Sequence, residues 1–296
     1  MSRLTPKLLL CSTLVAPSLL AAQDIGGSVV ELDEIIVFGG LLPTNLQTTG
    51  ATIDVAESED LSIAGIGASP AGNASRGVAV SANGGVGTRS TVRIRGLSGS
   101  YIGVRVDGID VTDPSSTQTA FNFGTLLTGS LDRVAVIKGT QSAIYGSDAI
   151  GGVVEVESWR PTEDGFSGKG KLEFGSFETT AGNLSLGYLD DRAELALSLG
   201  RVTSEGFSAR DSDDEADGFE QSSVNLYAAY QVSDAIRVGL SGIWSDSTSE
   251  FDRSTGDSSG EFDETRQGVR LFGEYQIGSW THELSFSSYE VDRFDA

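Results

Sequence analysis

The sequence is nearly devoid of the side chains used in thiol and imidazole chemistry. Its 296 residues include one cysteine, Cys11, and one histidine, His282. Cys11 lies in the N-terminal hydrophobic segment, so the rest of the chain can form no disulfide and no cysteine metal site. A single histidine supplies no histidine cluster either. These scarcities argue against an enzyme built on a thiol nucleophile or a histidine-rich metal centre.

Basic residues, proline and long apolar runs are also scarce. The chain has 20 Lys and Arg against 42 Asp and Glu, a net charge of −22, and only 6 prolines beside 38 glycines. Such acidity argues against a nucleic-acid partner, whose phosphates require a basic surface. The glycines predict many turns. After the N-terminal segment no apolar run is long enough for a transmembrane helix, which leaves strands as a way to cross a membrane.

The first 22 residues have the features of a secretory signal. Arg3 and Lys7 supply positive charge, Leu8–Leu20 is mostly apolar, and Ala21–Ala22 offers a small-residue cleavage site. The alternative is an ordinary N-terminal hydrophobic helix. We therefore predict that residues 1–22 are a signal peptide and that the protein is exported.

Residues 46–160 predict a small α+β domain. Short β-branched runs are separated by turn residues such as Asp107-Gly108. The stretch Asp132–Val156 is the most informative: a β-branched run, a glycine turn, a small-residue link, Gly151-Gly152 and a second β-branched run. Glycines are placed where the backbone needs a positive φ or a close approach, so this stretch predicts two strands joined by a tightly folded link.

Residues 161–296 predict seven antiparallel strands. Segments near 168–176, 178–188, 192–204, 219–232, 236–247, 266–277 and 281–292 alternate apolar with small or polar residues. Short turns alternate with long acidic loops at Glu205–Gly218 and Ser247–Thr265, which is the pattern of an outer-membrane barrel. The alternative is a soluble antiparallel sheet whose aromatic residues fill a core.

Three motifs punctuate the N-terminal half. The first is DEIIVF at Asp33–Phe38, the second joins VRIRG at Val92–Gly96 to VRVDGI at Val104–Ile109, and the third joins IKG at Ile137–Gly139 to YGSDAIGG at Tyr145–Gly152. In this order and spacing they resemble the energy-coupling box and the plug signatures of the TonB-dependent outer-membrane receptors. The resemblance covers essentially the whole chain.

The resemblance assigns roles to particular residues. The energy-coupling box would be Asp33, Glu34, Ile35, Ile36, Val37 and Phe38, with Glu34 and Phe38 standing where the family usually has threonine. The plug motif would be Arg93, Arg95, Gly96, Asp107, Gly108, Tyr145, Gly146, Gly151 and Gly152. The box would add a strand to the periplasmic partner TonB; the alternative is a plain first strand of the next domain.

The family's architecture predicts how the plug is held. Arg93, Arg95 and Arg105 alternate within short strands, so we expect them to pair with wall carboxylates such as Glu173 or Glu194, because paired charges are the tolerable way to bury charge. The alternative is that these arginines are ordinary surface residues.

The acidic loop near residue 214 is a candidate metal site. Asp211, Asp213, Asp214 and Asp217 supply hard oxygen ligands within seven residues, which suits Ca²⁺. The alternative is a solvated acidic loop without a ligand. In cobalamin receptors of the family, an aspartate-rich loop between the third and fourth strands binds calcium, and this loop occupies that place.

The resemblance implies a receptor that binds and imports a scarce metal chelate, cobalamin or a ferric siderophore, across the outer membrane of a Gram-negative bacterium. We expect a signal (1–22), a periplasmic segment with the box (23–45), a plug (46–160) and an N-terminal part of the barrel (161–296). About seven of 22 strands would be present, so the chain would be incomplete and unable to transport alone. The alternatives are a plug-bearing binding or signalling module and, less favoured, a secreted enzyme.

Overall fold

Two β-sheets and a short hairpin carry the fold of the computed structural model. The structure describes residues 35–36, 44–45, 50–63, 65, 76–113, 120–208, 216–252 and 259–295. The predicted signal peptide, 1–22, lies outside the described residues. No described helix is long and apolar enough to span a bilayer.

A five-stranded mixed sheet forms the centre of the N-terminal domain. Its strand order is β3-β8-β9-β6-β7, and β6 pairs parallel with β9 while the other pairs are antiparallel. The strands are β3 (Thr52–Glu57), β6 (Ile102–Val106), β7 (Ile109–Asp110), β8 (Leu131–Lys138) and β9 (Gly152–Ser158). A separate hairpin joins β4 (Val78–Ala82) to β5 (Ser90–Ile94). The short β-branched runs of the sequence, at Thr91–Arg95, Ile102–Val106, Arg133–Ile137 and Gly152–Val156, correspond to β5, β6, β8 and β9, whereas β3, β4 and β7 were not predicted.

Short helical turns and a buried core complete this domain. The turns are η1 (Ser58–Asp60), η3 (Gly99–Tyr101), η4 (Phe123–Thr125), η5 (Thr128–Ser130) and α2 (Ser142–Tyr145). Ile94, Ile102, Val104 and Val154 are fully buried in one hydrophobic cluster. Burying each such side chain contributes about 1.5–3 kcal/mol, so the β-branched runs of the sequence form the core.

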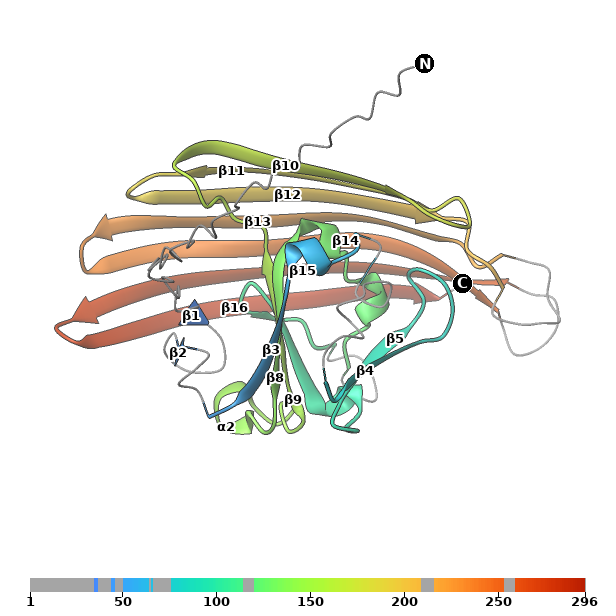
Figure 1. The fold of residues 1–296 in the computed structure, drawn as a ribbon, viewed down its shortest axis with the longest axis horizontal. Coiled ribbons are helices and arrows are strands. Elements are labelled where there is room, and N and C mark those ends of the chain that lie inside the picture. Colours follow the sequence, from blue (N-terminus) through green and yellow to red (C-terminus); the bar gives the residue numbers. More distant parts are fainter. Residues whose placement is uncertain are drawn as a thin grey trace, which may run out of the picture. The chain divides into compact units, whose positions relative to one another are not determined.

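A seven-stranded antiparallel sheet, hereafter the wall, follows the plug-like domain in sequence order (Figure 1). Its strands are β10 (Gly165–Phe174), β11 (Thr180–Leu189), β12 (Ala193–Ser204), β13 (Phe219–Ser233), β14 (Ile236–Asp252), β15 (Ser259–Ile277) and β16 (Trp280–Asp295). The seven predicted strands are confirmed. The long loop expected at Ser247–Thr265 is wrong, because β14 and β15 continue into it.

Cross-strand hydrogen bonds explain the extra length of β14 and β15. The Thr248 hydroxyl donates to Asp263 over 2.7 Å, and the Thr265 hydroxyl donates to Asp246 over 2.7 Å. Threonine and aspartate are common in loops, so the sequence favoured a loop here. Opposite one another on adjacent strands, however, their side chains form hydrogen-bonded pairs that stabilise the sheet.

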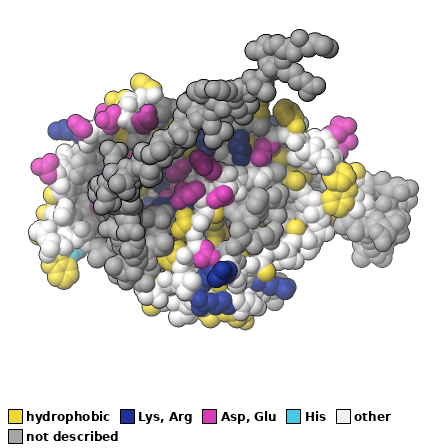
Figure 2. Space-filling model, viewed as in Figure 1, with side chains coloured by type: hydrophobic (Ala, Val, Ile, Leu, Met, Phe, Trp, Pro, Cys, Tyr) yellow, Lys and Arg dark blue, Asp and Glu magenta, His cyan; other side chains and the backbone are white. Residues whose placement is uncertain are grey.

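The wall has its apolar side chains on the face away from the N-terminal domain. Leu195, Leu197 and Leu199 of β12 are 46%, 37% and 43% exposed, whereas Ala196, Ser198 and Val202 are buried. Figure 2 shows further hydrophobic side chains, in yellow, at the margins of the molecule. A soluble sheet would cover the leucine side. The outward leucines and inward small residues are the arrangement of a lipid-facing barrel wall.

Replacing Gly152 should test the tight link of the glycine-rich stretch. Gly152 has φ +150°, and an added Cβ would lie 2.3 Å from the Ile137 carbonyl oxygen. We expect Gly152→Ala to lower the free energy of unfolding by about 1–3 kcal/mol, because the neighbouring backbone must shift. The measurement is urea unfolding in detergent. Gly170→Ala is the matched control, since its Cβ would meet nothing nearer than 3.9 Å; equal effects would contradict the prediction.

Candidate ligand-binding site

The Asp107-Gly108 turn anchors the N-terminal domain to the wall. Asp107 has φ 48° and Gly108 has φ 78°, which explains the glycine at the second position. The buried Asp107 carboxylate accepts hydrogen bonds from the Ser158 amide at 3.1 Å and from Arg160 at 3.2 Å. Its carbonyl oxygen accepts from the Ser241 hydroxyl of β14 at 2.9 Å. The predicted turn residues therefore have a structural role at the wall.

Arg160 extends this anchor into a charged network. Its guanidinium lies 3.3 Å from the centre of the Tyr227 ring and 3.8 Å from the Glu194 carboxylate. Glu194 also accepts from Arg237 at 2.9 Å. The side chains of Asp107, Arg160, Glu194 and Arg237 thus form a series of alternating charge. Each charged group has a partner of opposite charge, which is the condition for burying charge at low cost.

The expected pairing of the plug arginines is wrong. Glu194 pairs with Arg160 and Arg237, and Glu173 pairs with Lys171. Arg93 is exposed on β5, and the exposed Arg95 donates to the Thr52 hydroxyl at 3.3 Å. Arg93 lies on the exposed side of β5, opposite the buried Val92 and Ile94, and Arg95 follows the strand with φ 51°.

Arg105 takes part in a different cluster, inside the N-terminal domain. Its guanidinium donates to the Gly108 carbonyl at 2.8 Å and lies 5.3 Å from the centre of the Tyr145 ring. Burial raises the pKa of the Glu155 carboxyl from 4.5 to about 7, and the nearby positive charge of Arg105 offsets part of that rise. Tyr145, the last residue of α2, therefore contributes to a buried polar cluster.

The remaining glycines of the motif shape the chain around this cluster. Gly96 and Gly146 have φ +86° and +93°, and Gly146 ends α2. The Gly151 amide donates to the Tyr101 carbonyl at 2.7 Å, and an added Cβ there would approach the same oxygen to 3.1 Å. The glycine-rich signature is thus explained by backbone geometry and not by direct ligand contact.

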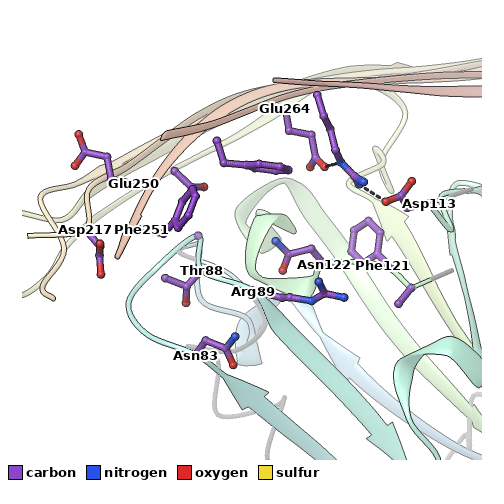
Figure 3. A pocket seen from close by; sticks show the side chains of 15 residues that line it. Asn83, Thr88, Arg89, Asp113, Phe121, Asn122, Asp217, Glu250, Phe251 and Glu264 are labelled. Atoms are coloured by element: carbon purple, nitrogen blue, oxygen red, sulfur yellow. Dashed lines mark hydrogen bonds and ion pairs between the residues drawn. The ribbon is translucent and has the colours of Figure 1, made fainter. Parts of the chain in front are cut away.

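A cavity of about 640 Å³ lies between loops of the N-terminal domain and the wall. It lies beside Ser249–Phe251 of β14 and Phe262 of β15. Figure 3 shows Glu250 and Asp217 at one end, Asp113 at the other, and Arg89, Asn122 and Phe121 between them. Phe251 and Phe262 add apolar surface. Aromatic surface with a few polar groups is typical of a small-molecule site.

Ion pairs hold one end of this cavity. Arg293 of β16 pairs with Asp113 of the N-terminal domain and with Glu264 of β15. Glu264 also pairs with Arg266, whose guanidinium bonds the Thr125 hydroxyl. The wall and the loops of the N-terminal domain are thereby fixed relative to each other at the cavity.

Asn122 fixes the opposite side of the cavity lining. Its side-chain oxygen accepts from the Ser90 amide at 2.9 Å and the Gly124 amide at 3.0 Å. This bond ties the β4–β5 hairpin to η4. The sequence motifs marked none of the following lining residues: Asn83, Arg89, Phe121, Asn122, Phe251, Phe262 and Arg293. The glycine cluster of 84–87 hinted at a loop, but nothing local indicates that it meets the wall.

Two predicted sites fall largely outside the described residues. Of the coupling box, only Ile35–Ile36 is described, as strand β1 paired with β2 (Thr44–Asn45) of the same chain; Asp33, Glu34, Val37 and Phe38 lie outside. Asp211, Asp213 and Asp214 of the calcium loop also lie outside. Asp217 is buried and lines the cavity. Within the described ranges, no group of three metal-binding side chains occurs.

An α+β domain that packs against the small-residue face of an outwardly apolar antiparallel sheet defines a plugged barrel wall. Comparison with known proteins agrees: residues 45–153 match the TonB-dependent receptor plug domain. Residues 45–153 are therefore a TonB-dependent receptor plug domain, as the sequence motifs predicted. This family consists of receptors and transporters, not enzymes.

The relatives and solved structures differ in the ligands that their names state. A vitamin B12 transporter of Photobacterium profundum is 29% identical over 59% of this chain, and one of Vibrio vulnificus is 32% identical over 60%. Each match spans 29% of the relative. The ferric enterobactin receptor of Pseudomonas aeruginosa has a TM-score of 0.65 at 12% identity, covering 83% of this chain and 42% of that one. The ferric yersiniabactin uptake receptor of Yersinia pestis has a TM-score of 0.60 at 18% identity, with the same coverage.

The raised pKa of Glu155 predicts a pH dependence of stability. Between pH 4.5 and about 7 the folded protein holds the Glu155 proton while the unfolded chain has released it. The free energy of unfolding should therefore fall as pH rises through this window, by up to about 3 kcal/mol. Urea unfolding in detergent at pH 4.5 and pH 8 would measure it. Glu155→Gln should flatten the dependence and the exposed Asp191→Asn should not; an unchanged slope in Glu155→Gln would contradict the assignment.

Removing Arg160 should loosen the domain from the wall. Arg160→Ala leaves Asp107 buried without its cation, a loss of about 3 kcal/mol. We expect faster proteolysis of the N-terminal domain in detergent at intermediate urea. Arg192→Ala, which removes an exposed arginine in the turn between β11 and β12, is the control. Equal proteolysis rates in the two variants would show that the network does not hold the domain.

Proposed function

We propose that the chain is the N-terminal part of a TonB-dependent outer-membrane receptor that binds a scarce metal chelate and imports it. The cavity between the plug loops and the wall is the observation that carries the proposal. It presents aromatic surface beside arginine, amide and carboxylate groups. The plug family model matches residues 45–153 and the match to the first relative spans only 29% of that protein, so transport is a property proposed for the whole receptor.

The proposed organisation follows the sequence boundaries. Residues 1–22 would direct export, 23–45 would carry the coupling box, 46–160 would form the plug and 161–296 would begin the barrel. The outward leucines of β12 support contact with outer-membrane lipid of a Gram-negative bacterium. The Asp33–Phe38 box would add a strand to TonB, whose pull would displace the plug.

Cobalamin is the first substrate candidate and ferric siderophores are the second. The sequence relatives carry names of vitamin B12 transporters, whereas the similar solved structures include siderophore receptors at sequence identities that compare folds only. Calcium bound by the acidic loop at Asp211, Asp213, Asp214 and Asp217 would accompany the cobalamin alternative.

Binding without transport is proposed for residues 1–296 on their own. Among the described strands, β10 and β16 are the two edges of the wall and each pairs on one side only. Unpaired edge amides and carbonyls are not tolerated in lipid, so seven strands need further strands to close. This chain alone would then act as a plug-bearing binding module.

Uptake measurements test the function. The full reading frame and residues 1–296 would each be expressed in a Gram-negative host that lacks its own receptors. We expect the full receptor to take up labelled cyanocobalamin or a ferric siderophore, and residues 1–296 to support no uptake.

A coupling-box variant separates energy coupling from binding. Ile36→Pro removes a strand amide, so it should abolish uptake and leave binding to outer membranes intact; Ile36→Val is the control. Binding with and without Ca²⁺ examines the acidic loop. A full receptor that neither binds nor imports any of these chelates would refute the proposal.

A further inference from the structure

We propose that Arg89 selects the ligand by charge. Its guanidinium binds one anionic group, while the Glu250 carboxylate disfavours ligands that carry several anionic groups. The inference rests on the proposed receptor function and adds the chemical class of its ligand. That class is a large, partly apolar molecule of low net charge that carries a single anionic group.

Arg89 is held in place by its backbone, with its side chain left exposed. Its carbonyl accepts from the Asn83 amide at 3.2 Å, which closes the loop between β4 and β5. The next amide, that of Ser90, donates to Asn122 at 2.9 Å. Thr88 is fixed by its own bond to the Gly85 carbonyl at 2.8 Å. The loop therefore presents the Arg89 guanidinium from a defined position.

The other arginine of the cavity is already occupied. Arg293 bridges Asp113 and Glu264, so its charge is compensated within the protein. Arg89 has no ion pair among the described residues. A guanidinium that lines a cavity and has no carboxylate partner can form a charge-assisted, two-pronged bond to a phosphate or carboxylate of a ligand.

Glu250 supplies the opposing charge. Its carboxylate accepts from the Gly218 amide at 2.8 Å, a bond that fixes its position without neutralising its charge. Arg293 and Arg266 compensate Asp113 and Glu264, and the lining keeps two further carboxylates, Glu250 and Asp217, against one further guanidinium, that of Arg89. In a concave site with low-dielectric walls such a charge excess repels a multiply charged anion, which is how unfavourable contacts produce specificity.

The uncharged lining completes the ligand class. Phe251 and Phe262 are partly exposed and offer apolar surface to the ligand, and Asn122 keeps its amide nitrogen available because its oxygen is bonded to the backbone. Figure 3 shows Arg89 directly beside Asn122. An anionic group at Arg89 would thus bring neighbouring amides within reach of Asn122 and an apolar face onto the rings.

Three probes in outer membranes carrying the full receptor test the proposal. Cyanocobalamin has one phosphodiester, dicyanocobinamide has the same corrin ring without it, and a ferric tris-catecholate carries several negative charges. We expect Arg89→Gln to weaken cyanocobalamin binding at least about tenfold and dicyanocobinamide binding less than about twofold, because a charge-assisted hydrogen bond is lost only with the former. Arg89→Lys should restore part of the loss.

Glu250 and a distant arginine give the matched comparisons. Glu250→Gln should strengthen binding of the ferric tris-catecholate several-fold and leave cyanocobalamin nearly unchanged. Arg192→Gln should alter neither. An equal loss of cyanocobalamin and dicyanocobinamide in Arg89→Gln, or no loss, would overturn the role of Arg89. Preference of the wild type for the tris-catecholate would overturn charge selection but keep the receptor function; binding of no probe would refute the function itself.

Discussion

The fold depends on the pairing of charges that are buried between the plug and the wall. Asp107 sits in a turn that only a left-handed backbone can make, and its side chain is fully buried. An unpaired carboxylate in such a place would cost several kcal/mol. Arg160 and the Ser158 amide supply its partners, and the Asp107 carbonyl receives the wall's Ser241 hydroxyl. The plug is thus held through this charge-paired contact together with an apolar contact, in which Ile63 and Leu127 of the plug cluster with Ala181, Val202 and Phe219 of the wall.

The same principle operates at the cavity. Arg293 and Arg266 alternate with Asp113 and Glu264, so the wall and the plug loops share two guanidiniums and two carboxylates. Both anchors join residues far apart in sequence. Between them the small side chains of the wall allow the plug to approach, and Val86 of the loop after β4 packs against the apolar cluster that contains Phe219 of the wall.

Periodicity and turn chemistry made most of this fold predictable. Alternation located all seven wall strands, and the β-branched runs of the glycine-rich stretch located β8 and β9, although the helical turn α2 between them was not predicted. The alternation by itself left open whether the apolar side meets lipid or the core of a soluble sheet, because a period of two defines the two sides of a strand but not their surroundings. The sequence-based prediction also assigned Glu194 to the wrong arginines. A carboxylate's partner depends on three-dimensional register, and Arg160 lies in the link between domains, where no pattern marked it.

The position of Arg160 has a consequence for how the plug can move. Arg160 belongs to the link between β9 and β10, the last strand of the plug and the first of the wall. It has a plug carboxylate, Asp107, on one side and a wall carboxylate, Glu194, on the other. If the Asp107 turn moves away from Ser241, Arg160 can remain paired with Glu194 and stacked on Tyr227. Only the Asp107 carboxylate would then lose its ion-pair partner, and water would reach it as the turn leaves the wall. The network therefore stabilises the packed arrangement of plug and wall and also lowers the free-energy cost of separating them.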